Sequence, residues 1–256
     1  MPHRRLAFLL LAVFPIAEPA WAQQPQRDAQ AVVVLQRAFT AMGGRAPTDS
    51  VATGSIELLE GSKTETGTIR ILNRGLDQSA EHIGMRSGNR SLIYSRGEAN
   101  GVLGTTVKAF TLELASSSQS PEFPLILIAA ALTNSDSAFQ YLGTETVGGI
   151  QAHHMRYWNT YGSSPKLRNL AEFSVKDVWV GVVSGLPLKL GYDRRNGGGA
   201  ESRVPLAVFY GDYRNVGGVL YPFLIQKSLN GTPWTTITIQ SVSFNTGLTD
   251  TDFPVQ

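Results

Sequence analysis

Between residues 51 and 244, apolar and polar residues alternate in short runs that glycine-containing turns separate. Successive side chains of a strand point to opposite faces, so this period of two predicts β-strands joined in an antiparallel meander. The residues at 215–218 and 230–231 favour tight hairpin turns. We expect strands at 51–59, 64–72, 76–85, 91–95, 138–144, 150–158, 173–184, 188–193, 204–216, 219–228 and 235–244, with strand-like residues also at 102–114.

Two segments replace this alternation with the repeat of a helix. Residues 28–42 have apolar residues three and four positions apart, Asp28 as a possible cap and two glycines directly after the segment. Residues 124–132 are apolar on every side, so we expect a short helix that its surroundings cover. This second helix is either part of the core or a lid over an apolar cavity. Pro165 can begin one or two further helical turns that run to Leu170.

The first 22 residues have the order of a secretory signal peptide. Two arginines precede an apolar run at 6–17, and Ala20 and Ala22 are the small residues that signal peptidase requires. We therefore expect cleavage after Ala22, export to the periplasm and a mature chain, 23–256, that folds as one domain. The sequence has no cysteine, which excludes disulfides and the acylation of a first cysteine, so we expect a soluble protein.

The charge of the chain gives no sign of an electrostatic partner. The formal net charge is +2, and lysine and arginine are scattered through the sequence. Nucleic-acid-binding proteins usually gather basic residues in a stripe, so we expect no nucleic-acid partner. Charged residues make up 16% of the chain and hydrophobic residues 42%, a balance that suits a folded sheet protein and argues against disorder. We expect a monomer.

No arrangement of residues points to a metal, a cofactor or a catalytic site. Beyond the signal peptide the histidines are His82, His153 and His154, and the last two are neighbours whose side chains point to opposite faces of a strand. The sequence also lacks the motifs of nucleophile elbows, P-loops, zinc proteases and dinucleotide sites. We predict no metal ligand, no cofactor and no catalytic residue.

A pair of carboxylates is the remaining route to catalysis. A glycosidase needs only two such groups, and they can lie far apart in the sequence. Their spacing here selects no pair, so catalysis is the less favoured interpretation. The candidates are Glu172, Asp177, Asp193 and Asp212.

The last third of the chain carries a pattern of turn and strand residues. Segment 209–223 reads FYGDYRNVGGVLYPF, and segment 237–253 reads ITIQSVSFNTGLTDTDF. This pattern resembles the closing hairpin of the LolA-like family of periplasmic lipoprotein carriers. Phrases at 143–152 and 184–188, and the order of elements over 28–254, are similar to that family as well. The matching residues of the hairpin are Tyr213, Val216, Gly217, Gly218, Pro222, Asn245, Gly247, Leu248, Asp250 and Phe253.

The resemblance implies a mainly β (α+β) fold. Its expected form is a single, strongly curved antiparallel sheet, an open half-barrel, with helices covering the concave face. The resemblance further implies a protein that shelters lipid chains and has no catalytic residues. Related receptors are anchored through a lipidated cysteine, and Gln23 stands at that place in this chain, which favours a diffusing carrier.

A carrier of this kind needs a long apolar concavity, because each buried methylene of an acyl chain contributes about 0.8 kcal/mol. The two helices and the alternating strands supply candidates for its lining. A polar rim of His153, Arg156 or Arg214 would meet the head group. The candidate lining residues are Val32, Leu35, Phe39, Leu127, Trp179, Phe209, Tyr221, Phe223, Ile237 and Ile239.

The favoured hypothesis is a soluble exported carrier that binds the acyl chains of lipids or lipoproteins and takes them across the periplasm. Its partners would be a lipid or a lipidated protein, together with envelope proteins of the inner and outer membranes. Two alternatives remain at this point. One is an exported hydrolase that uses Asp, Glu or His, and the other is a non-catalytic adaptor domain of an envelope complex.

Overall fold

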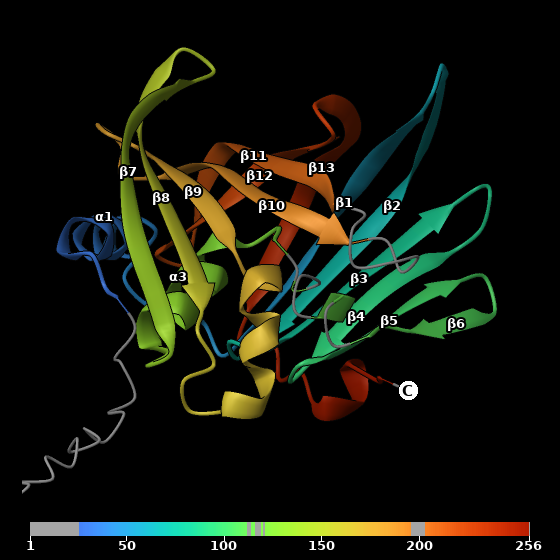
Figure 1. Ribbon diagram of the computed structural model, residues 1–256. Helices are drawn as coiled ribbons and strands as arrows, with labels where there is room; N and C mark the ends of the chain where they lie inside the picture. The colour runs from blue at the N-terminus through green and yellow to red at the C-terminus, as the bar shows by residue number, and fades with distance from the viewer. Residues whose placement is uncertain (1–25, 112–113, 116–118, 120, 196–202, 256) are drawn as a thin grey trace, which may run out of the picture.

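The computed structural model describes residues 26–111, 114–115, 119, 121–195 and 203–255 (Figure 1). The segment 1–22, which the sequence predicts to be a signal peptide, lies outside the described residues. None of the described helices has the length and the apolar run that crossing a bilayer requires.

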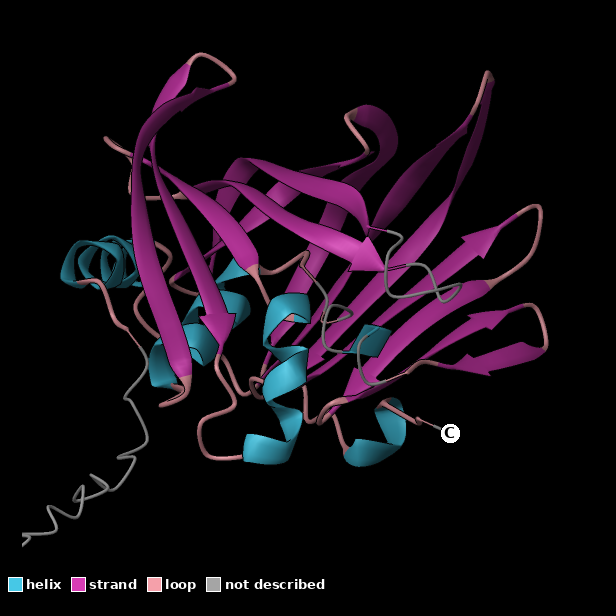
Figure 2. Ribbon diagram, viewed as in Figure 1, coloured by secondary structure: helices cyan, strands magenta, loops and turns pink. Residues whose placement is uncertain are grey.

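Within the described residues, thirteen strands form one antiparallel sheet in the order β6-β5-β4-β3-β2-β1-β13-β12-β11-β10-β9-β8-β7. The edge strands β6 and β7 do not pair within the described part of the chain, so the sheet stays open. Figure 2 shows it as one curved wall, which confirms the predicted fold class. The strands are β1 Asp49–Glu60, β2 Lys63–Arg74, β3 Gln78–Met85, β4 Arg90–Ser95, β5 Glu98–Leu103, β6 Thr106–Ala109, β7 Ser137–Val147, β8 Ile150–Asn159, β9 Lys176–Gly181, β10 Pro187–Arg195, β11 Arg203–Val216, β12 Val219–Leu229 and β13 Thr232–Phe244.

Tight turns and shifts of register between neighbouring strands shape this sheet. Asn230 and Gly231 have φ values of 49° and 77°, as a two-residue hairpin turn between right-twisted strands requires. The register of β1 against β13 shifts between Thr53 and Gly54. A Cβ at Gly54 would collide with the Thr238 carbonyl oxygen, so the close approach of the two strands depends on glycine. Such bulges bend the strand that carries them.

Helices α1 and α3 pack on this sheet, and both agree with the predicted bounds to within one residue. In α1 (Ala29–Ala41), the carboxylate of Asp28 accepts hydrogen bonds from the backbone N–H groups of Gln30 at 2.8 Å and Ala31 at 3.2 Å. This is the cap that the sequence predicts. Helix α3 (Pro124–Thr133) is buried along most of its length and packs against α1. Short 3₁₀ helices span Pro165–Phe173 and Asp250–Asp252.

The core lies between the helices and one face of the sheet, which we call the inner face. It includes Leu35 of α1, Leu127 of α3, and strand residues such as Ile71, Val208 and Ile237. A smaller cluster lies on the opposite, outer face, where Phe253 packs against Leu72, Ala80 and Ile93. The C-terminal residues therefore cover part of the outer face of β2, β3 and β4.

Hydrogen bonds attach this C-terminal segment to the sheet. The carboxylate of Asp49 accepts bonds from the backbone N–H groups of Thr246 at 2.6 Å and Gly247 at 2.9 Å. The side-chain oxygen of Asn245, whose φ is 56°, accepts bonds from the backbone N–H and the hydroxyl of Thr48. Asn245 and Gly247 of the sequence pattern therefore help to attach the end of the chain to the start of β1.

Two strand predictions need correction. The expected strand-like run at 102–114 is only partly right, because β5 ends at Leu103, a turn with Gly104 at φ 59° leads into β6, and β6 ends at Ala109. Residues 112–113 of this run lie outside the described residues. The expected strand at 173–184 is too long at both ends, since Phe173 closes a 3₁₀ helix and β9 ends at Gly181. Apolar residues in turns and short helices imitate a strand when only the pattern is read.

Candidate functional site

Most of the candidate lining residues lie in the main core. The partly buried residues among them, Val32 and Phe39 of α1, pack against the same cluster. The structure thus gathers residues from α1, α3, β12 and β13 on the inner face. The fully clustered residues are Leu35, Leu127, Tyr221, Phe223, Ile237 and Ile239.

Trp179 and Phe209 lie on the outer face instead. In β9, Val178 and Val180 belong to the main core, so Trp179 between them points the other way. The Lys189 ammonium lies 4.0 Å from the centroid of the Trp179 ring and 5.7 Å from that of Phe209. The ring of His154 stacks on Trp179 with centroids 4.2 Å apart. These two candidates therefore stand apart from the other eight.

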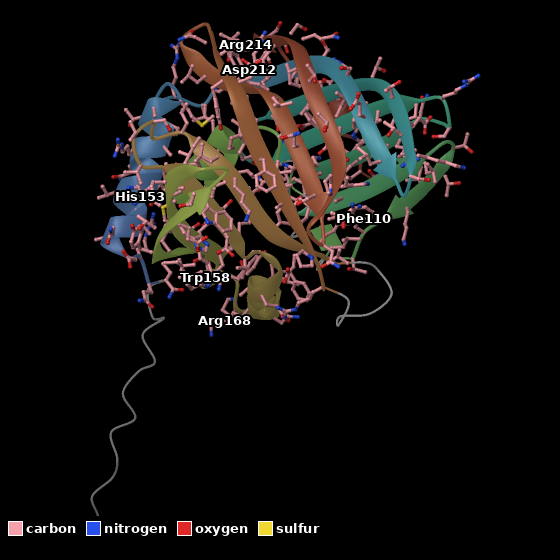
Figure 3. The ribbon with its side chains drawn as sticks, turned by 90° about the horizontal axis from the view of Figure 1, so that it is seen from above. Phe110, His153, Trp158, Arg168, Asp212 and Arg214 are labelled. Atoms are coloured by element: carbon pink, nitrogen blue, oxygen red, sulfur yellow. The ribbon has the colours of Figure 1, made fainter. Side chains whose placement is uncertain are left out.

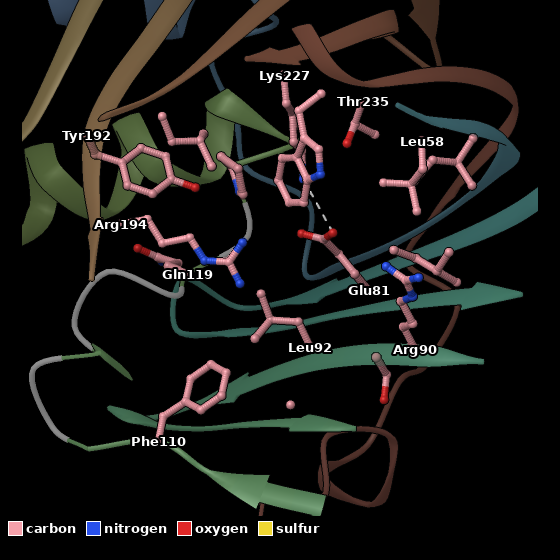
Figure 4. Close-up of a pocket in the computed structure, with 17 residues that line it drawn as sticks. Leu58, Glu81, Arg90, Leu92, Phe110, Gln119, Tyr192, Arg194, Lys227 and Thr235 are labelled. Carbon is pink, nitrogen blue, oxygen red and sulfur yellow. Dashed lines mark hydrogen bonds and ion pairs between the residues drawn. The ribbon is translucent and has the colours of Figure 1, made fainter. Parts of the chain in front are cut away.

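A cavity of about 240 Å³ opens on the inner face, between β1, β3 and β4 on one side and β10 to β13 on the other (Figure 4). We call it the inner cavity. Apolar side chains make up much of its lining. They are Ile56, Leu58, Ile83, Leu92, Phe110, Leu206 and Trp234.

Two buried charges, Glu81 of β3 and Lys227 of β12, line this cavity, and a third, Glu122, lies beside Lys227 just before α3. The ammonium of Lys227 is 3.4 Å from a Glu81 carboxylate oxygen (Figure 4), and it forms a second ion pair with Glu122. Burial, with the nearby charge of Glu122, raises the pKa of Glu81 to about 8. Burial alone would lower the pKa of Lys227, but the charges of Glu122 and Glu81 raise it. We call this group the buried ion triad.

Sequence reasoning missed the triad, although part of the signal was present. Tyr221, Phe223 and Ile225 share a face of β12, and continuing the alternation by two residues places Lys227 on the same face. Glu81 pairs with Ile71 of β2 in the sheet, so it also faces the core. The sequence shows no link between β3 and β12, because that proximity depends on the curvature of the whole sheet.

Two arginines also line the inner cavity, Arg90 of β4 and Arg194 of β10. The guanidinium carbon of Arg194 lies 5.7 Å from the centroid of the Trp234 ring. Figure 4 shows the Arg194 side chain directed into the cavity. The cavity therefore combines apolar walls with cationic groups, an arrangement that suits an amphiphilic molecule.

The residues expected at the rim do not line the inner cavity. His153 Nδ1 lies 2.9 Å from the Tyr141 hydroxyl, and Arg156 donates two hydrogen bonds to Asp177 at 2.8 and 2.9 Å. Arg214 pairs with Asp212, and Figure 3 shows these two side chains well away from Phe110 of the cavity.

The candidate carboxylates of a hydrolase are each occupied by arginine. Asp177 binds Arg156, Asp212 binds Arg214, and Arg203 lies 2.7 Å from Glu172 and 3.7 Å from Asp193. These carboxylates form no pair across the inner cavity, which none of them lines. Within the described residues, no group of three or more His, Asp or Glu side chains could hold a metal ion.

Comparison with known proteins gives a fold. No protein-family model matches the chain, and no curated protein matches it by sequence. Solved structures do match. A domain from Vibrio parahaemolyticus, whose name assigns it to outer membrane lipoprotein sorting, has a TM-score of 0.58 at 16% identity and covers 88% of this chain and 96% of its own.

Two further structures agree with it. A LolA superfamily protein from Nitrosomonas europaea has a TM-score of 0.57 at 16% identity, covering 88% of this chain and 97% of its own. A DUF1329 family protein from Desulfovibrio piger has a TM-score of 0.54 at 14% identity, with coverages of 88% and 97%. None of the three names describes an enzyme. The chain therefore has a LolA-like fold, as the resemblance of its C-terminal third implies.

Proposed function

We propose that this protein is a carrier that binds the acyl chains of lipids or lipoproteins on the inner face of its sheet. The observation that carries the proposal is the inner cavity, whose apolar walls lie beneath a curved sheet of LolA-like fold. Burial of apolar surface is the only interaction that a hydrocarbon chain offers, so a concavity of this composition is what such a ligand needs.

A full-length acyl chain needs more space than the inner cavity offers, and movement of helix α3 would provide it. The volume of about 240 Å³ equals that of roughly eight water molecules in the liquid, which accommodates only a short stretch of chain. Leu125, Ile126, Leu127 and Ile128 of α3 are all buried. If α3 moves aside, an acyl chain can replace its side chains against the same apolar wall, and each buried methylene contributes about 0.8 kcal/mol.

We extend the proposal to transport across the periplasm. The signal-peptide pattern of residues 1–22 supports export. The lipoprotein-sorting name of the Vibrio parahaemolyticus domain supports a lipid or a lipidated protein as cargo. The partners would then be the cargo and envelope proteins of the inner and outer membranes that load and unload it.

We also propose that the protein is not an enzyme. The carboxylates that could serve a hydrolase are bound by arginines, and the buried carboxylates of Glu81 and Glu122 share Lys227. A general acid must donate a proton, and a general base must accept one, at the reacting bond, whereas these groups are held in ion pairs with one another.

Blocking the cavity tests the carrier proposal. Leu92 lines the inner cavity, whereas Val102, on the neighbouring strand, pairs with Ser91 and faces the other side of the sheet. Leu92→Trp should fill the cavity and weaken the binding of a fluorescent fatty-acid probe about tenfold, while Val102→Trp leaves affinity within about twofold of wild type.

The measurement is a fluorescence titration of the mature protein, with circular dichroism confirming that both variants are folded. A folded Leu92→Trp variant that binds the probe as wild type does would contradict the inner cavity as the binding site. Failure of the wild type to bind the probe would contradict the carrier function itself.

A further inference from the structure

A second cavity, of about 590 Å³, lies beside α3. We call it the lysine cavity. Tyr94 of β4 lines it from one end of the sheet, and Tyr157 of β8 and Lys176 of β9 line it from the other. In the order of strands, β4 and β9 are each third from an edge. The curl of the sheet therefore builds this cavity from two regions that are far apart along the sheet.

Lys176 has an unusual environment for a charged side chain. Only 5% of its surface is exposed, and it shares the inner face with Val178 and Val180. Among the described residues, no hydrogen bond or ion pair involves its ammonium group. Burial lowers the pKa of Lys176 to about 8. A buried charge is normally paired, because an unpaired one loses its hydration without compensation.

The other polar groups at the lysine cavity do not supply the missing counter-charge. Asp77 and Lys176 are the charged residues that line it, and no ion pair joins them in the described part of the chain. Tyr157 lies directly opposite Lys176 in the β8–β9 ladder, and its hydroxyl likewise has no hydrogen bond to a described residue. An ammonium and a phenol thus offer donors to the same space.

The backbone beside these groups is strained. Tyr161, which also lines the cavity, has a φ of 52°. Such a conformation is rare for a bulky residue and costs about 1–3 kcal/mol where it persists. The side-chain oxygen of Asn159, another lining residue, accepts a 2.9 Å hydrogen bond from the Tyr161 backbone N–H and holds this conformation. Strain of this kind is concentrated at binding sites and switch regions.

We propose that the lysine cavity is a binding site for an oxyanion, a carboxylate or a phosphate group, with Lys176 as its ionic partner and the Tyr157 hydroxyl as a further donor. A bound oxyanion supplies the negative charge that Lys176 lacks among the described residues. Its oxygens accept hydrogen bonds from the Lys176 ammonium and the Tyr157 hydroxyl. This proposal does not require that the protein is a carrier, because a free carboxylate or phosphate ion would bind Lys176 in the same way as a lipid head group.

A lipid head group fits the surroundings as well. Gln119 lines both the lysine cavity and the inner cavity, so the two spaces adjoin it. Leu127 and Ala131 of α3 also line the lysine cavity. An amphiphile with its anionic group at Lys176 would extend its chain along α3 toward the apolar walls of the inner cavity.

The test compares two ligands of equal chain length, dodecanoate and dodecanol, by isothermal titration calorimetry at neutral pH. Wild type should bind the carboxylate about tenfold more tightly than the alcohol. Lys176→Met should reduce the affinity for dodecanoate to that for dodecanol, and Lys176→Arg should retain most of the difference. Lys166→Met, on the exposed 3₁₀ helix, is the matched control and should change neither affinity.

A second arm uses inorganic phosphate alone and follows the thermal unfolding temperature. If phosphate raises the unfolding temperature of wild type and Lys176→Met abolishes the rise, a free anion is a sufficient ligand. If phosphate has no effect but wild type binds dodecanoate more tightly than dodecanol, the ligand is the head group of an amphiphile. Either outcome supports the oxyanion site. Equal binding of dodecanoate and dodecanol by wild type, with no stabilisation by phosphate, overturns it and leaves the carrier proposal standing. Phosphate stabilisation without binding of either amphiphile would instead contradict the carrier proposal.

Discussion

Two lysines are buried on the inner face of the same sheet, and the fold treats them in opposite ways. Lys227 lies between Glu81 and Glu122, whereas Lys176 has no counter-charge among the described residues. Both side chains are at least nine-tenths buried. The first lysine is therefore neutralised within the fold and serves the structure. The second carries an unpaired charge, which is the condition of a site that awaits a ligand.

The largest expected effect on the free energy of unfolding comes from replacing Lys227, the paired lysine. Lys227→Met leaves Glu81 and Glu122 without their shared cation, and loss of one partner from a buried pair costs about 3–5 kcal/mol. Urea unfolding followed by circular dichroism should show that loss. The control replaces all three members together, as Glu81→Leu, Lys227→Met and Glu122→Leu, and should recover most of the stability. Equal losses in both variants would contradict the ion-triad account.

The same substitution at Lys176, the unpaired lysine, should stabilise the protein. The pKa of Lys176 falls from 10.5 to about 8 on folding, which corresponds to roughly 3 kcal/mol of lost stability where the lysine is charged. Lys176→Met should therefore raise the free energy of unfolding at pH 7 by about that amount.

The pH dependence fixes the sign of this effect. A lysine whose pKa is lowered in the folded state binds fewer protons there than in the unfolded state, between about pH 8 and 10.5. The advantage of the variant is full below about pH 8 and disappears as the pH rises past 10.5. Urea unfolding of both proteins across this range checks it, and a variant less stable than wild type at pH 7 would contradict the unpaired charge.

Two tyrosines, one near the buried ion triad and one at the lysine cavity, allow the same comparison with a smaller expected change in stability. The hydroxyl of Tyr210 donates a 2.7 Å hydrogen bond to the carbonyl oxygen of Pro121, near the triad, whereas that of Tyr157 has no such partner in the described residues. Tyr210→Phe should cost about 1–1.5 kcal/mol, and Tyr157→Phe less than about 0.5 kcal/mol. Thermal unfolding of the two variants measures both. If Tyr157→Phe costs as much as Tyr210→Phe, the Tyr157 hydroxyl has a structural role.

Much of the sheet could be predicted from the sequence because its signal is local. The expected strands at 150–158 and 219–228 end within one residue of β8 and β12, since period-two alternation and glycine turns define both ends. The run at 102–114 was only partly right, because Gly104 divides it into the hairpin of β5 and β6 and β6 ends at Ala109.

The site was less predictable, because it depends on which face of each strand turns inward. Alternation places Trp179 on the face of β9 opposite Val178, but it does not say which of the two faces the core. Asp177 shares a face with Trp179, but Lys176 shares the opposite face with Val178, so the charged residues of β9 do not indicate which face is the outer one. The triad and the lysine cavity join strands that are distant in the sequence, and only the curvature of the sheet brings them together.

Native mass spectrometry of the mature protein, purified from lipid-containing cells, tests the central claim most directly. We predict that wild type carries non-covalent adducts whose masses correspond to acyl-bearing lipids, and that Leu92→Trp loses most of them while Val102→Trp retains them. A folded wild-type protein that appears only at the mass of its bare polypeptide, before and after incubation with fatty acid, would contradict the proposal that the inner face binds acyl chains.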